Sequence, residues 1–374
     1  MSIKEEKNRR AILLLNVGTP DKAEVRSVRK YLGEFLNDPF VIDLPWIFRK
    51  ILVNLIIVPF RAPKSTKLYQ QLWTREGSPL LYNTIKLQEK LQDIVGKEDV
   101  VFAAMRYGNP SIKTVLNQIS KGGFDEVVVA PLFPQYATST TETAIQAVNK
   151  NASKINGFPK IRIVQQFYKH PDFINAWAVN AAKYNLNDYD HVVFSYHGLP
   201  LSHVNKMHPL EDSLNCHCDQ KMPDHGSLCY KATSYSTTRL LVEKLGIKEE
   251  DYSVGFQSRL SKNWLSPFTD ELIIRLAKEG NKKVLIFSPA FVADCLETNV
   301  ELGIEYAELI NPNSSDIAFK EYKSLVQLKK DLGLGIKLIA HIRNHTSDIE
   351  KALQCNIDGI SLVISTSEIL INAS

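Results

Sequence analysis

The chain has 374 residues, about two domains by length, and its 44% hydrophobic and 23% charged residues are ordinary for a globular protein. Its 45 Lys and Arg against 41 Asp and Glu give a net charge of +4, too small a basic excess for a nucleic-acid-binding protein, so we expect no nucleic-acid partner. Five cysteines are too few for a disulfide framework, and the charged start MSIKEEKNRR leaves no room for a secretory signal, so we expect a cytoplasmic protein.

Apolar runs that end in Gly, Pro or polar residues alternate with helix-like stretches over the first 300 residues. The expected strands lie at residues 11–17, 100–110, 125–135, 161–168, 190–200, 252–259 and 283–294. The expected helices include residues 83–95, 171–183, 232–245 and 270–279. Continuous apolar runs are typical of strands buried on both faces, and their alternation with helices indicates βα units in parallel sheets. The sequence therefore predicts an α/β fold.

Two pairs of segments suggest that the fold is built from similar halves. AILLLNVGTP resembles HVVFSYHGLP, and VVVAPLFPQYATSTTET resembles VLIFSPAFVADCLETNV. We expect halves at about 8–185 and 186–312, facing one another across a cleft supplied by the C-terminal ends of strands. Residues 313–374 are treated as a separate tail.

Residues 51–60, ILVNLIIVPF, form an apolar segment with basic residues on both sides. The segment is too short to cross a membrane. Two interpretations are open: a buried helix with basic ends, or a surface that makes peripheral contact with an anionic membrane.

Chemically useful side chains follow several expected strands. His197 ends the strand at 190–200 beside Gly198, as a base or metal ligand would, although a structural role is equally open. Glu297 follows the strand at 283–294, and Asp294 lies three residues before Glu297. If residues 294–297 were helical, both carboxylates would lie on one face of the helix. Asp294 as a helix cap is the alternative.

Arg106 and Tyr107 end the strand at 100–110. The planar guanidinium of an arginine at that place suits a substrate carboxylate, and an ion pair with another part of the chain is the alternative.

Cysteine and histidine side chains crowd into one polar stretch, namely Cys216, His217, Cys218, His225 and Cys229. The stretch predicts either a metal or iron–sulfur site or an exposed loop of reduced thiols. Its spacing lacks the paired C-x2-C of structural zinc sites.

Eight motifs, in order, resemble the ferrochelatase family over about residues 8–308. They are LLLNVGTPD, YLGEFLNDP, GSPL, AMRYGNPS, PLFPQYATSTTET, FSYHGLP, GFQSRLSKNWLSPFTDE and SPAFVADCLET. This family inserts ferrous iron into a porphyrin. The resemblance implies two Rossmann-like, chelatase-type halves whose parallel sheets face a porphyrin cleft.

The resemblance also implies roles for individual residues. The invariant histidine of the family falls on His197 and its catalytic glutamate on Glu297, which makes these two residues the expected metal ligands. Asp294 matches the acidic residue that shares in proton or metal traffic. Expected substrate-binding residues are Arg106, Tyr107, Ser195 and Gln257.

The resemblance makes ferrous iron and porphyrin the expected substrates, and residues 51–60 correspond to the apolar lip of the family. Cys216, Cys218 and Cys229 lie in an insertion at 211–231. Some members hold a two-iron cluster on four cysteines, and with three here we assign none.

Residues 320–370 instead resemble a fragment of the homocitrate and isopropylmalate synthase group, and at this length we assign no second activity to them. His341, Arg343 and His345 are expected to be non-catalytic. Two other functions stay open: a cobalt or nickel chelatase, and a carrier that binds a tetrapyrrole or metal without turnover.

Overall fold

The computed structural model describes residues 9–208, 213, 215–224, 226–281, 283–305, 339–343 and 359–363. The chain divides into two compact units between Phe167 and Tyr168. This division precedes the expected boundary at 185, because helix α7 (Pro171–Ala181) packs against α9 (Tyr230–Leu245) of the second unit.

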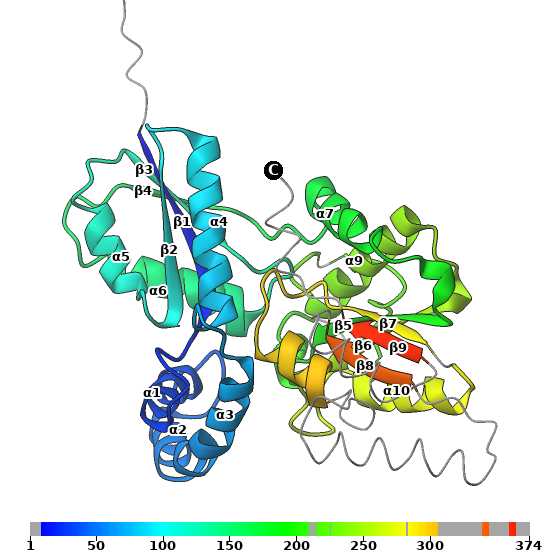
Figure 1. Cartoon of the computed structure of the whole chain (residues 1–374). Helices are drawn as coiled ribbons and strands as arrows, with labels where there is room; N and C mark the ends of the chain where they lie inside the picture. Colours follow the sequence, from blue (N-terminus) through cyan, green and yellow to red (C-terminus); the bar gives the residue numbers. More distant parts are fainter. Residues whose placement is uncertain are drawn as a thin grey trace, which may run out of the picture. The chain divides into compact units, whose positions relative to one another are not determined.

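The first unit contains a parallel sheet in the order β2-β1-β3-β4 (Figure 1). Its strands are β1 (Arg10–Thr19), β2 (Val100–Gly108), β3 (Glu126–Pro131) and β4 (Lys160–Ile163). The accompanying helices are α1 (Val25–Leu36), α2 (Trp46–Ile51), the π-helix η1 (Leu52–Ile57), α3 (Val58–Leu72), α4 (Pro79–Val95), α5 (Ile112–Ile119), the π-helix η2 (Thr138–Glu142) and α6 (Thr143–Ala152).

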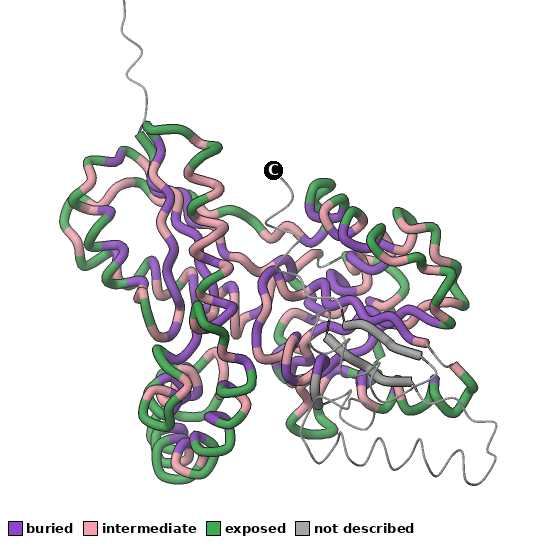
Figure 2. Tube along the Cα trace, in the orientation of Figure 1, coloured by how far each residue is buried: buried purple, intermediate pink, exposed green. Residues whose placement is uncertain are grey.

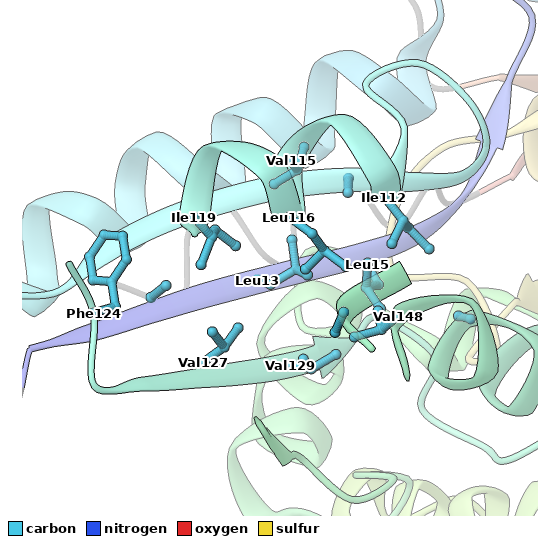
Figure 3. Close-up of a cluster of buried hydrophobic side chains, with 14 residues drawn as sticks. Leu13, Leu15, Ile112, Val115, Leu116, Ile119, Phe124, Val127, Val129 and Val148 are labelled. Carbon is cyan, nitrogen blue, oxygen red and sulfur yellow. The ribbon is translucent and has the colours of Figure 1, made fainter. Parts of the chain in front are cut away.

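The core of this unit lies between the sheet and the helices α5 and α6. Leu13 and Leu15 of β1 contact Leu116 of α5 and Val148 of α6 in one buried cluster (Figure 3). Successive side chains of a strand point to opposite faces, and Asn16 accordingly contacts Thr84 of α4. Both faces of β1 are therefore covered, which explains its continuous apolar sequence.

The second unit repeats this arrangement in the order β6-β5-β7-β9-β8, again with all described pairings parallel. Its strands are β5 (His191–His197), β6 (Tyr252–Gln257), β7 (Val284–Phe287), β8 (Ile339–Arg343) and β9 (Gly359–Val363). Besides α7 and α9, its helices are the 3-10 turns η3 (Leu186–Asp188) and η4 (Glu249–Asp251), then α8 (Leu201–Asn205), α10 (Thr269–Lys278) and the π-helix η5 (Glu297–Glu305). In each unit the first strand lies between the second and the third. The expected pair of similar α/β halves is thus present.

The tail contributes to the second sheet. Strand β9 pairs with β7 at Ile286 and Val363, and β8 pairs with β9. His341 and Arg343 belong to β8, whose side chains lie outside the described set, and His345 lies outside it altogether.

The segment 51–60 is helical and buried on one face only, through Val53 and Val58, so its interpretation as a buried helix holds for that face alone. Leu55 and Phe60 are 68% and 72% exposed. The exposure extends to α2, and Figure 2 shows exposed residues along these helices. Within the described part of the chain, no helix combines the length and apolarity needed to span a membrane.

Candidate active site

His197 is the last residue of β5, the first strand of the second unit. Strand β5 has β6 on one side and β7 on the other. The chain therefore leaves β5 towards one side of the sheet and later returns on the other, so the strand order reverses at β5. Open α/β sheets bind ligands at such switch points. His197 is half-buried.

One ring nitrogen of His197 is committed to the backbone. Its Nδ1 lies 2.6 Å from the carbonyl oxygen of Gly198. A carbonyl oxygen only accepts hydrogen bonds, so Nδ1 carries the proton and Nε2 of the neutral ring keeps its lone pair. The backbone thus orients an imidazole whose Nε2 can accept a proton or bind a metal.

The side chain of His197 projects from the sheet face that carries α10 and η5. Val193, two positions before Ser195, packs with Leu302 of η5, and Ser195 contacts Thr269 of α10 at 2.9 Å. Residues two apart on a strand share a face. His197 therefore belongs to that same face, where its ring also lies beside that of Phe291, with 6.3 Å between ring centroids.

Gln257 connects the strand of His197 to the helix of Glu297. It is the register partner of His197 in β6, and its carbonyl oxygen accepts the N–H of Gly198 at 2.8 Å. Its side-chain Oε1 accepts a hydrogen bond from Ser195 at 2.8 Å, and its Nε2 donates to the carbonyl oxygen of Glu297 at 3.1 Å. Ser195 and Gln257 are fully buried, so their polar atoms depend on these bonds.

Glu297 begins helix η5, whereas Asp294 lies before it, so the expectation that both share one helical face is wrong. The N–H of Cys295 donates to Thr298 Oγ1 at 3.0 Å, and this bond accompanies the start of the helix. Asp294 and Glu297 are both half-buried. Burial, followed by the charge of Glu297, raises the pKa of the Cys295 thiol well above its ordinary value, so this thiol stays neutral.

The sequence motifs missed Glu301, four residues after Glu297. Its carboxylate accepts the N–H of Ser258 at 2.5 Å and also the Ser258 hydroxyl. Ser258 has a φ of 63°, uncommon for a residue with a side chain. The two bonds hold this conformation in the QSR turn. The signal in the sequence was the i, i+4 spacing of the glutamates.

Arg106 and Tyr107 of β2 belong to the first unit, where both bind Asp38. The Asp38 carboxylate pairs with the Arg106 guanidinium and accepts the Tyr107 hydroxyl at 2.9 Å and that of Thr143 at 2.6 Å. Arg106 Nε also donates to Thr143 Oγ1 at 2.8 Å. Arg106 thus forms an ion pair with Asp38 within the first unit, which is the alternative to binding a substrate carboxylate.

This network ties β2 and the start of α6 to the loop after α1. Tyr107 is buried, and burial together with the charge of Asp38 raises the pKa of its hydroxyl. Sequence reasoning did not single out Asp38 or Thr143. Both lie inside motifs of the resemblance, YLGEFLNDP and PLFPQYATSTTET, but nothing local in the sequence indicates their partners.

The cysteine stretch of the second unit is not an exposed loop of thiols. Cys216, Cys218 and Cys229 are free thiols and all are buried. Cys218 and Cys229 lie beside His208, a residue outside the cluster noted in the sequence. His217 is exposed, and His225 lies outside the described residues.

We predict that Gly198→Ala destabilises the protein whereas Gly33→Ala does not. A Cβ at position 198 would lie 2.7 Å from the carbonyl oxygen of Gln257, so the turn after His197 must shift. Gly33 lies within α1 with open space around it. Overpacking costs about 1–3 kcal/mol, while Gly→Ala at an unstrained site stabilises by about 0.4–1 kcal/mol.

Thermal unfolding of the two variants and the parent checks this prediction. We expect a midpoint several degrees lower for Gly198→Ala and an unchanged or higher midpoint for Gly33→Ala. Equal midpoints would mean that the contact between Gly198 and Gln257 does not constrain the turn.

The sequence model described as ferrochelatase matches residues 9–327. A ferrochelatase of Opitutus terrae is 43% identical over 304 residues, covering 79% of this chain and 87% of the relative. One from Legionella pneumophila (strain Corby) is 43% identical over 308 residues, covering 80% and 89%. One from Coxiella burnetii (strain Dugway 5J108-111) is 40% identical, covering 79% and 84%.

These matches span most of both the chain and its relatives. The family model extends past the motifs noted in the sequence to residue 327, and the resemblance of the tail to a synthase fragment has no counterpart in it. The chain belongs to the ferrochelatase family.

Proposed function

We propose that this chain inserts ferrous iron into a porphyrin, protoporphyrin IX or coproporphyrin III, to form heme. Two pyrrole N–H bonds break and two protons leave, all four ring nitrogens form bonds to the iron, and the iron stays ferrous. The observation that carries the proposal is the His197 ring, whose Nδ1 is fixed by Gly198 and whose Nε2 keeps its lone pair at a strand end.

His197 is the proposed acceptor of the pyrrole protons. Pyrrole N–H groups are weak acids in a rigid ring, so their removal needs a base held on one face of the macrocycle. Nε2 suits this role because the Nδ1 bond fixes the ring, and imidazole nitrogen also binds ferrous iron.

Glu297 and Asp294 are the proposed partners of His197 in metal delivery and proton removal. Their half-buried carboxylates carry the negative charge that attracts a divalent cation. Of the expected substrate-binding residues, Ser195 and Gln257 are fully buried, so we assign them to positioning the histidine and the glutamate. Arg106 and Tyr107 act through Asp38 to hold the first unit in shape.

Anaerobic incubation of the full chain with ferrous iron and either porphyrin tests the activity. We expect the absorption spectrum of the metalloporphyrin to develop faster than without protein. His197→Ala should reduce insertion by about 100-fold or more, the contribution typical of a general base. Porphyrin binding should stay within a few-fold.

The matched control is His170→Asn, at an exposed histidine that caps α7 through its ring nitrogen. Asparagine keeps a capping acceptor, so this variant should insert iron at the parental rate. Near-normal turnover by His197→Ala would refute the role of the histidine. Porphyrin binding without insertion by the parent protein would support the alternative of a tetrapyrrole carrier. Faster insertion of cobalt or nickel than of iron would support the alternative of a cobalt or nickel chelatase.

We infer further that the surface of α2, η1 and α3 makes peripheral contact with an anionic membrane from the cytoplasmic side. Its exposed apolar residues are Trp46, Ile47, Phe48, Ile51, Leu55, Ile56 and Phe60. Its exposed basic residues are Lys50, Arg61, Lys64 and Lys67. An apolar surface bordered by cations is typical of interfacial binding, in which apolar burial and attraction to anionic lipid act together.

Sedimentation with vesicles containing phosphatidylserine tests this inference. Leu55→Ser with Phe60→Ser should weaken binding by about tenfold or more, since burial of each side chain contributes about 1.5–3 kcal/mol. Ile94→Ser is the control, because Ile94 is equally exposed, at 66%, but lies on α4. Unchanged binding by the double variant would contradict the inference.

A further inference from the structure

We propose that His208, Cys218 and Cys229 hold a single Zn²⁺ ion, with Cys216 as the fourth ligand, in a structural site separate from the candidate active site. Nε2 of His208 and the two sulfur atoms lie within 4.8 Å of one another, and all three residues are buried. The proposal does not depend on the chelatase activity.

The distances fit one tetrahedral ion. Zinc–sulfur bonds of about 2.3 Å and zinc–nitrogen bonds of about 2.0–2.1 Å place ligand atoms about 3.6–3.8 Å apart. His208 Nε2 is 3.0 Å from Cys229 Sγ and 3.9 Å from Cys218 Sγ. Shifts of under about 1 Å would bring the three atoms to these positions.

Cys216 is the remaining buried thiol of this segment. It lies two residues from Cys218 and is 4% exposed. Its Sγ now donates to the carbonyl oxygen of Ser213 at 3.2 Å, so rotation of the side chain away from this acceptor would free it for the ion. Three thiolates and one imidazole make a closed set of the structural zinc type.

A cation, the Lys231 ammonium, which is also paired with the Asp219 carboxylate at 3.5 Å, lies beside the proposed fourth ligand. Three thiolates, a neutral imidazole and Zn²⁺ sum to −1. The Lys231 ammonium lies 3.6 Å from Cys216 Sγ and also contacts the carbonyl oxygen of Cys216 at 3.4 Å. The N–H of Ala232 donates to Cys229 Sγ at 3.4 Å. A cation and a backbone donor therefore already face the sulfur atoms.

A two-iron cluster on four cysteines does not fit these residues. The described part of this segment supplies three thiols, and the fourth donor at hand is the His208 imidazole. The three closest donor atoms also converge on one point, whereas a two-iron cluster divides its ligands between two metals.

The site would fasten the connection between two helices. His208 follows α8 and its N–H bonds to the carbonyl oxygen of Asn205, while Cys229 is the N-cap of α9. Helix α8 begins four residues after His197. A bound zinc ion would thus hold in place the segment that follows β5, the strand that ends at His197.

Metal analysis of the full chain tests the proposal. The protein is incubated with Zn²⁺ under reducing conditions, treated with a weak chelator to strip exposed sites, and assayed for zinc, iron and acid-labile sulfide. We expect about one zinc per chain, without sulfide. Cys229→Ser and Cys218→Ser should each lower zinc affinity by about 100-fold or more, since even outer partners of ligands contribute 10–100-fold.

Two controls separate this site from others. Cys295→Ser removes a buried thiol elsewhere in the same unit, and His197→Ala removes the candidate active-site ligand. Both should retain one zinc. Cys216→Ser should bind zinc more weakly than the parent, as loss of a fourth ligand requires.

A spectroscopic measurement on the unaltered chain covers the case in which a cysteine variant fails to fold. Co²⁺ in place of zinc should give the visible bands of a tetrahedral thiolate site, and zinc should displace it. Octahedral Co²⁺ bands, two irons with two sulfides per chain, or full zinc retention by a folded Cys229→Ser would each overturn the proposal.

Discussion

The buried side-chain amide of Gln257 is the interaction on which the second unit depends. An amide carries two donors and an acceptor with two lone pairs, and burial makes unmade bonds costly. Ser195 satisfies the oxygen of this amide, and the carbonyl oxygen of Glu297 accepts from its nitrogen. The backbone of Gln257 meanwhile fixes the turn after His197. One residue thereby contacts both the turn after the histidine and the backbone of the glutamate.

The arrangement of strands could be predicted from sequence because it follows from burial. Runs such as residues 11–17 are apolar throughout since helices cover both faces, and the structure confirms strands at each expected position. The placement of His197 at a strand end was predicted for the same reason. The contacts between side chains could not be predicted, because contacts such as that of Asp38 with Arg106 join residues 68 positions apart in the sequence.

Helix starts and exposure were the least predictable features. The local spacing of Asp294 and Glu297 suited a common helical face, but the bond between Cys295 and Thr298 accompanies a later start. The apolar segment at 51–60 was open to two interpretations because periodicity alone does not say what covers a helix. The histidine beside the cysteines, His208, was missed since it lies eight residues before the first of them.

Gln257→Leu tests most directly whether the side-chain amide of Gln257 positions Ser195, two residues before His197, and Glu297 for insertion, because it removes both amide bonds and leaves the backbone bond to Gly198 in place. Steady-state insertion of ferrous iron, with thermal unfolding as a check on folding, separates positioning from mere stability. We predict a kcat at least about tenfold lower, within the range for misplaced catalytic groups, and a porphyrin KM changed by only a few-fold. A folded variant with kcat near that of the parent would contradict the account.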